Sequence, residues 1–302
     1  MRVSSLKYYI SNPLRVFRAL AARGLFDWMS DEQFIKALYF TTFKKRLNLK
    51  NPRTFNEKIQ WLKLYDHNPT YPEWVDKITA KKKVEEAIGK EYIIPLLYSW
   101  TNPSDIRFEE LPEHCVLKCN HDQGSTIIID KSKEIDETKI RDYFKEKLLK
   151  NAYRTTREWP YKKIKPQILC EPFIGRDVID YKFFCFNGKP AFVNIGQKNS
   201  ETHLMHITFL DFDWIKLQFQ RKDFPPVSVL PEKPKKFDEM LKIASILSKG
   251  TTFVRIDLFC IDDNIYFSEF TLYPTSGLIE FSPEEGDYVL GGKIKLPELK
   301  EE

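Results

Sequence analysis

Two apolar segments on either side of a short polar turn limit the folds open to this chain more than any other feature. Residues 253–260 (Phe-Val-Arg-Ile-Asp-Leu-Phe-Cys) and 265–273 (Ile-Tyr-Phe-Ser-Glu-Phe-Thr-Leu-Tyr) are rich in β-branched and aromatic side chains, and residues 262–264 (Asp-Asp-Asn) lie between them. This pattern predicts two buried antiparallel strands joined as a hairpin. We therefore expect a β-sheet whose core includes this hairpin.

Four polar side chains within these strands need an explanation. Alternation puts Arg255 and Asp257 on one face of the first strand, and Glu269 and Thr271 on one face of the second. If a three-residue loop closes with Asn264 in the left-handed region, Asp257 lies opposite Glu269, and the two carboxylates repel unless a cation joins them. Such oxygen ligands suit Mg²⁺ shared with phosphates. With a two-residue loop the carboxylates face opposite sides, and Asp257 can then simply pair with a basic side chain.

Composition limits the class of protein. The 302 residues are 42% apolar and 14% aromatic, enough for one large domain or two modest ones with a sizeable core. The net charge of +5 is mild and its Lys and Arg residues are dispersed, which does not support a nucleic-acid-binding protein. The five cysteines are odd in number and form no CxxC motif, as expected of reduced thiols in a cytoplasmic protein. Cys115, Cys119 and His121 could be three ligands of a zinc ion, but no fourth ligand follows at the spacing typical of a zinc site.

The N-terminus has an amphipathic pattern with two interpretations. No apolar run approaches the ~20 residues of a membrane helix, and there is no apolar core of a secretory signal. Apolar residues from Leu6 to Leu20 alternate with basic residues from Arg2 to Arg23. The segment either docks on the rest of the protein or rests on the inner face of an anionic membrane.

The distribution of predicted helices and strands divides the chain into three parts. We expect a helical N-terminal region (1–90), a small subdomain (91–170) and a large subdomain with a metal site (171–302). Helices are predicted at 32–38 after Asp31, at 55–62 with a Thr54/Glu57 capping box, at 76–88 closed by Gly89, at 137–150, and last at 236–247. Further strands are predicted at 93–98, 115–119, 126–129, 167–170, and at 181–186 and 191–195 around an Asn187-Gly188 turn.

Two segments have the chemistry of a nucleotide site. Lys118 leaves a strand just before the polar loop 120–126, where an ammonium and backbone N–H groups could hold phosphate, although an ordinary hairpin turn explains the same residues. Residues 168–174 form a strand that runs into an apolar hinge with one acid, Glu171, and such a hinge can pair with a purine edge. Asp180 and Lys182 then share one face of the next strand.

The order of these motifs resembles the ATP-grasp superfamily. The matching segments are residues 76–77, 116–124, 171–174, 180–182, 255–257 and 268–274. Residues 51–62 (Asn-Pro-Arg-Thr-Phe-Asn-Glu-Lys-Ile-Gln-Trp-Leu) and 180–190 further resemble its TupA-like branch, found with surface-polysaccharide and teichuronopeptide biosynthesis. The resemblance implies an α+β fold in which two antiparallel-sheet subdomains clamp ATP, here with a helical N-terminal layer.

The resemblance also implies roles for single residues at the nucleotide. Lys77 and Lys118 would contact phosphates, with Lys118 also catalytic. The loop that closes over the phosphates would include His121, Gln123, Gly124 and Ser125. Glu171, Phe173 and Ile174 would line the adenine, and Asp180 or Lys182 would lie near ribose or phosphate.

At the reaction centre, the resemblance implies that Asp257 and Glu269 hold Mg²⁺ and that Arg255 stabilises the transferring phosphoryl group. The commonest superfamily pattern has Asn where this chain has Thr271, a neutral hydroxyl that can still be a ligand. Residues Tyr273, Thr275, Ser276 and Gly277 lie where family members bind the acceptor carboxylate.

The implied activity is that of an ATP- and Mg²⁺-dependent carboxylate–amine ligase. A carboxylate becomes an acyl phosphate that an amine attacks, with a uronic acid or peptide of a bacterial surface polysaccharide as the expected acid. A glycosyltransferase is the alternative, since Asp211-Phe212-Asp213 has the Asp-x-Asp form, although these residues also fit the turn that ends a strand. A non-catalytic nucleotide-binding protein is a third class, against which the acidic pair argues.

Overall fold

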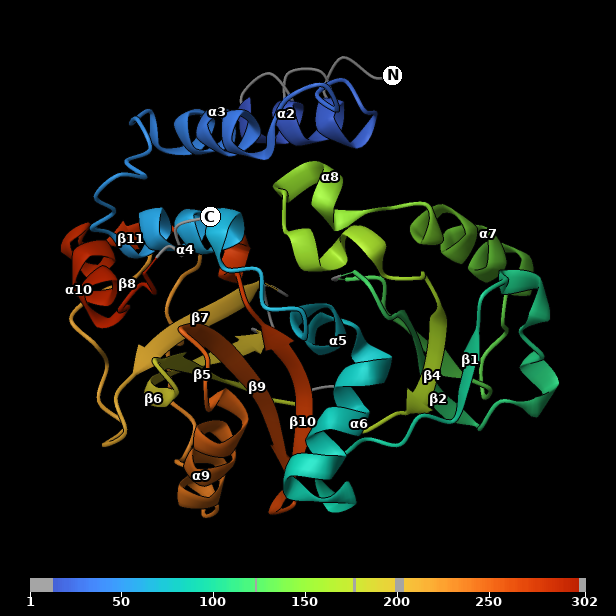
Figure 1. Ribbon diagram of the computed structural model, residues 1–302. Helices are drawn as coiled ribbons and strands as arrows, with labels where there is room; N and C mark the ends of the chain where they lie inside the picture. The colour runs from blue at the N-terminus through green and yellow to red at the C-terminus, as the bar shows by residue number, and fades with distance from the viewer. Residues whose placement is uncertain (1–12, 123, 176–177, 199–203, 299–302) are drawn as a thin grey trace.

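The computed structural model describes residues 13–122, 124–175, 178–198 and 204–298, and these residues contain two main antiparallel sheets and a two-stranded one, β11-β8 (Figure 1). The larger has the strand order β10-β9-β5-β6-β7. Its strands are β5 (Asp180–Phe186), β6 (Lys189–Lys198), β7 (Met205–Leu210), β9 (Phe253–Ile261) and β10 (Asn264–Thr271). Asn187 and Gly188 between β5 and β6 have φ angles of 50° and 75°, so the predicted hairpin is confirmed.

Helices cover both faces of the larger sheet. Phe183 and Phe184 are neighbours in β5 and so point to opposite faces. The Phe183 ring lies 5.7 Å from Phe237 of α9 (Phe237–Ser248), and the Phe184 ring lies 6.4 Å from Phe55 of α4 (Phe55–Tyr65). The main apolar core therefore lies on both sides of the sheet.

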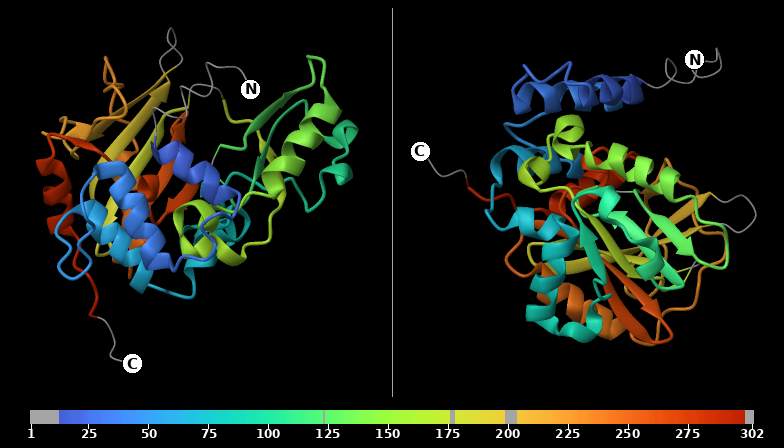
Figure 2. Two further views of the ribbon diagram at one scale, coloured as in Figure 1. Left: turned by 90° about the horizontal axis from the view of Figure 1, so that it is seen from above. Right: turned by 90° about the vertical axis from the view of Figure 1, so that its right-hand side faces the viewer.

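The smaller sheet has its own core. Its order is β1-β4-β2-β3, with β1 (Tyr98–Trp100), β2 (His114–Cys119), β3 (Ile127–Asp130) and β4 (Ile168–Pro172). The helix α7 (Glu137–Leu148) contributes the fully buried Phe144 to this core. This unit projects to one side of the larger sheet (Figure 2). The α+β class with two antiparallel sheets is confirmed.

The N-terminal helices do not form a single layer. They are α2 (Pro13–Ala22), α3 (Asp31–Phe43), α4, α5 (Tyr71–Val75) and α6 (Lys77–Ile88). Side chains of α4, α5 and α6 belong to the core of the larger sheet, whereas α2 and α3 pack on each other. The Thr54/Glu57 capping box is confirmed, but Ser30 rather than Asp31 caps α3, because its hydroxyl accepts the N–H of Gln33. The three domain boundaries stay a prediction.

The helix α2 docks on the protein. Leu14 and Phe17 pack against the cluster that contains Phe34 and Leu38 of α3. The first twelve residues, which include part of the predicted amphipathic segment, lie outside the described residues. Within the described ranges, we find no helix with the length and apolar character needed to span a bilayer.

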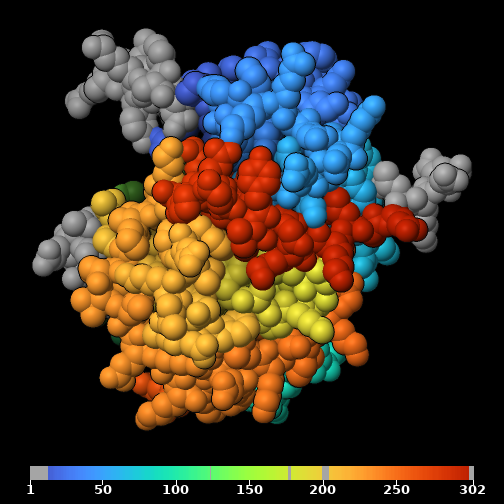
Figure 3. Space-filling view, turned by 90° about the vertical axis from the view of Figure 1, so that its left-hand side faces the viewer, coloured from blue at the N-terminus to red at the C-terminus, as the bar shows by residue number. Residues whose placement is uncertain are grey.

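Several elements differ from the prediction. The strand expected at 93–98 is only β1 plus one bridge between Ile93 and Phe267. The helix α9 is followed by α10 (Glu285–Lys293), which carries glycines that hide its helical pattern and whose Gly291 approaches the carbonyl of Arg53. Figure 3 shows this C-terminal part between the N-terminal helices and the larger sheet.

The shorter elements are α8 (Ala152–Thr156), β8 (Gln220–Arg221), β11 (Phe281–Ser282), and the 3-10 helices η1 (Lys90–Tyr92), η2 (Pro103–Asp105), η3 (Phe108–Glu110), η4 (Trp159–Lys163) and η5 (Pro274–Ser276).

Candidate functional site

Asp257 and Glu269 are directly paired across β9 and β10, as predicted, but the turn is not the one predicted. The loop has two residues, Asp262 and Asp263, with φ angles of 49° and 60°. That loop alone would place Ser268 opposite Asp257. A β-bulge between Phe267 and Glu269 adds one residue and brings Glu269 into the pairing.

Burial along β10 shows the effect of this bulge. Asn264, expected in the left-handed region, instead belongs to β10 and pairs with Ile261. Phe267 is buried before the bulge and Phe270 after it, a spacing of three that breaks the alternation of the strand. Two apolar side chains therefore stay in the core while Glu269 turns to the face of Asp257.

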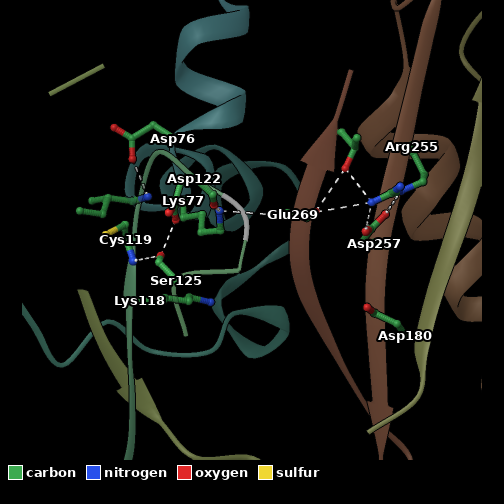
Figure 4. A network of polar contacts seen from close by, with 12 residues as sticks. Asp76, Lys77, Lys118, Cys119, Asp122, Ser125, Asp180, Arg255, Asp257 and Glu269 are labelled. Atoms are coloured by element: carbon green, nitrogen blue, oxygen red, sulfur yellow. Dashed lines mark hydrogen bonds and ion pairs between the residues drawn. The ribbon is translucent and has the colours of Figure 1, made fainter. Parts of the chain in front are cut away.

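The carboxylate of Asp257 is buried among cations. Its side chain is 1% exposed. The Nε and Nη2 atoms of Arg255 each donate to it over 2.6 Å (Figure 4). Lys182 Nζ lies 3.1 Å from its Oδ2. Burial raises the pKa of Asp257, but Arg255 and Lys182 outweigh this effect and hold the pKa below its ordinary value. Asp257 is therefore ionised at neutral pH.

Arg255 also joins Asp257 to the other two predicted metal ligands. Its Nη2 lies 3.5 Å from Glu269 Oε1 and donates to the Thr271 hydroxyl over 2.9 Å. The Thr271 hydroxyl donates to Glu269 Oε1 over 3.3 Å. Among the described residues no three Asp, Glu, His or Cys side chains come together as a closed metal site. Two carboxylates and a hydroxyl fit Mg²⁺, which takes few protein ligands and completes its shell with phosphates and water.

Lys77 reaches this face from the smaller-sheet side of the cleft. Its Nζ lies 3.8 Å from Glu269 Oε2 and donates to the backbone carbonyl of Asp122 (Figure 4). Its backbone N–H donates to the carbonyl of Asn120 over 3.1 Å. Since Lys77 is the first residue of α6 with Asp76 as its cap, the helix start fixes the lysine next to the predicted phosphate loop.

The loop between β2 and β3 is held by its own side chains. The Ser125 hydroxyl accepts the N–H of Cys119 over 2.9 Å and donates to the Asp122 carboxylate. Gly124 has a φ angle of 84° and open space around it, whereas Gln123 lies outside the described residues. The His121 ring lies between Asn120 and Lys150 in hydrogen-bond contact with both, and burial lowers its pKa, so this ring has protein partners rather than an open nitrogen.

Glu171 is the centre of a second charged cluster. Its oxygens lie 2.7 Å from Lys118 Nζ and 2.8 Å from Lys81 Nζ, and its side chain is 4% exposed. The sequence interpretation missed Lys81, although it lies four residues after Lys77 and hence on the same side of α6. The predicted hinge residues Phe173 and Ile174 follow β4 directly and are half-buried.

Asp180 and Lys182 share one face of β5, as the alternation predicts. Lys182 pairs with both Asp180 and Asp257, so this face continues the charged network of β9. One carboxylate oxygen of Asp180, Oδ1, is buried without a hydrogen-bond partner among the residues that the structure describes. Burial raises the pKa of Asp180, and Lys182 offsets part of this shift.

The predicted acceptor turn has an unusual backbone. Thr275, Ser276 and Gly277 have successive φ angles of 50°, 62° and 67°. A side chain at Gly277 would meet Ile59 and Gln60 of α4 at 2.6 Å, so only glycine fits there. Strained turns of this kind are held by their surroundings and are common at functional sites.

Two buried polar side chains of α4 hold the turn. Gln60 Nε2 donates to the carbonyls of Ser276 and Gly277 over 2.9 and 2.7 Å. Lys63 Nζ donates to the carbonyl and the hydroxyl of Ser276, each over 3.0 Å. The sequence interpretation missed both residues, although their spacing of three puts two polar groups on one apolar helix face.

Some of the residues described above line a cavity of about 850 Å³, whereas its lining does not include Lys77, Lys118, Glu171, Phe173, Ile174, Asp180, Lys182, Asp257 or Glu269. Arg255 and Thr271 line it at the charged face, Tyr273, Thr275 and Ser276 at the turn, and His121 and Asp122 at the loop. The cavity therefore extends from the loop between β2 and β3 and the Arg255–Thr271 part of the charged face to the predicted acceptor turn.

The Asp211-x-Asp213 sequence lies in a turn after β7. Asp211 Oδ1 accepts the N–H groups of Asp213 and Ile215 over 3.0 and 2.9 Å. This carboxylate is a turn-forming group.

Comparisons with known proteins place the chain in a family. Three similar solved structures are D-alanine–D-alanine ligase from Bacillus anthracis (16% identity, TM-score 0.37, 66% of this chain and 56% of that one), the same enzyme from Helicobacter pylori (17%, 0.41, 78% and 62%), and ATP-grasp ligase PsnB complexed with minimal precursor, Mg and ADP (10%, 0.38, 72% and 57%). The chain thus spans less than two thirds of these proteins. No curated protein sequence matches it. The family model for TupA-like ATPgrasp matches residues 57–295, well over half of the chain. The chain therefore belongs to the TupA-like ATP-grasp family.

Proposed function

We propose that this chain is an ATP-dependent carboxylate–amine ligase that forms an amide bond and releases ADP and phosphate. Family membership and the two-sheet fold support this function. The observation that carries it is the pairing of Asp257 with Glu269 around Arg255 on a buried strand face, with Lys77 opposite. Phosphoryl transfer needs this kind of fixed cation arrangement more than it needs covalent help from the protein.

At the nucleotide, Lys77 and Lys118 would bind phosphate oxygens, and the loop that contains His121, Gln123, Gly124 and Ser125 would cover them. Glu171, Phe173 and Ile174 would line the adenine and ribose. Asp180 and Lys182, beside Asp257, would reach ribose or phosphate.

At the reaction centre, Asp257, Glu269 and Thr271 would hold Mg²⁺, which neutralises phosphate charge when bound. Arg255 would then lose part of its contact with these carboxylates and donate to the transferring phosphoryl group. Tyr273, Thr275, Ser276 and Gly277 would position the acceptor carboxylate, whose conversion to an acyl phosphate gives it a leaving group. A cavity that excludes water protects such an intermediate from hydrolysis.

We further infer that the acid is a uronic acid or peptide precursor of a bacterial surface polysaccharide and that the amine is an amino acid or amino sugar. The segments at 51–62 and 180–190 support this class of substrate through the TupA-like family. Synthesis of such precursors would occur in the cytoplasm, and the basic N-terminus would provide any contact with the inner membrane face. Loss of liposome binding after removal of the first ~25 residues tests that contact.

A screen for ADP release tests the activity itself. Uronic acids and their nucleotide or lipid conjugates are combined with amino acids, and we expect ADP and phosphate only when both acid and amine are present. Release of AMP and pyrophosphate would reject this class of ligase. Asp257→Asn and Glu269→Gln should each abolish turnover in a folded chain, and wild-type turnover in Glu269→Gln would falsify the metal assignment.

A further inference from the structure

Glu158 is a carboxylate of the reaction cavity to which neither the family pattern nor the proposed chemistry gives a role. It immediately precedes η4 and lines the cavity of about 850 Å³ together with Arg255, Thr271 and Ser276. The cavity therefore holds an acid that is in hydrogen-bond contact with Ser276 of the predicted acceptor turn.

The other acids that line the cavity already have partners. Glu146 pairs with Lys150 over 3.1 Å, and Asp223 pairs with Arg221 over 2.6 Å. Asp122 accepts a hydrogen bond from the Ser125 hydroxyl. Glu158 likewise has hydrogen-bond contact with Ser276 and Thr156, but no basic side chain of the described residues lies within ion-pair distance of it.

The basic side chains that face Glu158, Lys63 and Arg18, do not form an ion pair with it. Lys63 Nζ, whose side chain is buried, makes its hydrogen bonds to the Thr156 carbonyl over 3.1 Å and to Ser276 over 3.0 Å. Arg18 of α2 also lines the cavity, and its Nε is buried without a hydrogen-bond partner within the described ranges. Burial raises the pKa of Glu158, and Lys63 together with hydrogen bonds to Ser276 and Thr156 offsets only part of this shift.

A ligase of this kind must deprotonate its amine. Near neutral pH an amine arrives as an ammonium ion, which has no lone pair for attack. A carboxylate in a desolvated cavity attracts that cation, and a raised pKa lets the carboxylate take the proton. Of the described acids in this cavity, Glu158 combines a place beside the acceptor turn with an oxygen pair free of a basic partner.

We propose that Glu158 binds the ammonium group of the amine substrate and accepts its proton as the amine attacks. This inference rests on the proposed ligase function. One N–H bond breaks and its proton passes to the Glu158 carboxylate. The freed nitrogen lone pair forms the C–N bond to the acyl carbon, the bond from that carbon to the phosphate oxygen breaks, and phosphate leaves with the electron pair. A second N–H bond of the attached nitrogen then breaks, and its proton passes to the leaving phosphate, which gives the neutral amide. Glu158 then returns the proton to water at the cavity mouth.

The alternative is that Glu158 only balances the charges of Lys63 and Arg18. The ionisable groups that face it are Lys63 from α4, Arg18 from α2, Tyr161 of η4 and Tyr273 after β10. A countercharge would support both half-reactions equally. A proton acceptor is needed only when the nucleophile arrives protonated.

The experiment compares two nucleophiles with the full chain. The acid and the amino acid are those that release the most ADP in the screen above, and hydroxylamine, which is neutral near neutral pH, traps the acyl phosphate directly. Glu158→Gln should keep hydroxamate formation within about twofold while amide formation falls by about 100-fold or more. The amide defect should shrink as the pH rises and the amino acid loses its own proton. Glu146→Gln, at the rim of the same cavity, should change neither rate.

Equal loss of both products in Glu158→Gln, or an unchanged amide rate, overturns the proposal. If this variant does not fold, Glu158→Asp, which keeps a carboxylate but withdraws it by one methylene, decides at a fixed neutral pH. Amide formation should fall more than hydroxamate formation, and equal losses of the two products overturn the proposal. Absence of hydroxamate and ADP with every acid would instead refute the ligase function, and the role of Glu158 with it.

Discussion

Arg255 is the residue on which the charged face depends. Its guanidinium contacts Asp257, Glu269 and Thr271, so a fixed cation lies where two carboxylates would otherwise repel. Burial lowers the pKa of Arg255, but the neighbouring acids outweigh this effect and raise it. The face is thus charged before any ligand binds, which is the preorganisation that electrostatic catalysis requires.

Loss of the Asp257 charge should destabilise the fold measurably. In Asp257→Asn, Arg255 and Lys182 lose their buried counterion, and removing one partner of a buried pair costs about 3–5 kcal/mol. Chemical denaturation measures this loss in the free energy of unfolding. Asp262→Asn, an exposed change in the same hairpin, should stay within about 0.5 kcal/mol. A loss in Asp257→Asn no larger than in this control would mean that the cluster is not held by ion pairing.

The sequence predicted the residues whose role follows from the pattern of their own strand. It did not predict the residues whose role depends on contacts with side chains far away in the chain. Alternation in β9 and β10 was enough to group Arg255 with Asp257. Gln60 and Lys63 acquire their role only from contacts more than two hundred residues away in the chain, at Ser276. In the sequence, Glu158 is an acid before an aromatic residue and nothing distinguishes it from other acids. Only the fold shows that it lines the cavity.

At the scale of elements, the β9–β10 hairpin has the predicted pairing for a different reason. The turn Asp262-Asp263 lacks the glycine of the common Asn-Gly and Asp-Gly turns, so the sequence did not decide between a two-residue and a three-residue loop. The bulge is nevertheless visible in the sequence, because the apolar residues Phe267 and Phe270, both buried, are three positions apart and so break the alternation of a regular strand. This break in the alternation predicts a bulge.

Deleting Ser268 tests this account of the register. Without Ser268 the ladder becomes regular, and Glu269 still pairs with Asp257 while Phe267 stays buried. Deleting Tyr266 also preserves the Asp257–Glu269 pairing but turns Phe267 out of the core, at a cost of about 3–5 kcal/mol more. Thermal unfolding of the two single-residue deletions compares them directly. Equal stabilities would contradict the bulge as the source of the register.

The Glu171 cluster connects α6, β2 and β4 and should produce a pH-dependent stability. Burial raises the pKa of Glu171, but Lys118 and Lys81 outweigh this effect and hold the pKa below 4.5, its ordinary value. The unfolded chain thus takes up this proton more readily. The stabilisation is complete above pH 4.5 and is lost as the pH falls through the native pKa.

Denaturation midpoints at neutral and acidic pH measure this effect. The wild type should lose more stability on acidification than Glu171→Gln, which has no carboxylate to protonate. The exposed Glu110, paired with Arg107, provides the matched control, and Glu110→Gln should follow the wild type. Parallel curves for the wild type and Glu171→Gln would show that the cluster does not couple these elements.

At the scale of the whole molecule, the candidate site is shared between the two sheets. The Lys77–Glu269 contact of 3.8 Å bridges the start of α6 and the edge strand of the larger sheet, and Lys77 is also bound to the loop of the smaller sheet (Figure 4). Strand patterns and motif order predicted the two sheets. They did not predict that α4, α5 and α6 share the core of the larger sheet. The apolar face of an amphipathic helix shows that the helix packs on something, but not on which sheet it packs.

A ligand that binds across this shared site should stabilise the chain, and it should do so in two separable steps. Binding to the native state alone adds about 2.7 kcal/mol at a ligand concentration one hundred times the Kd. We expect ADP with Mg²⁺ to raise the melting temperature of the wild type, and ADP with a chelator to raise it less. Glu269→Gln should retain the smaller, Mg²⁺-independent rise, since Lys118 and Glu171 lie in the other cluster. Lys118→Met should lose both rises, whereas Lys162→Met, outside the cleft, should keep both. A full Mg²⁺-dependent rise in Glu269→Gln would place the ion away from the paired carboxylates and would separate the metal from the face that Arg255 organises.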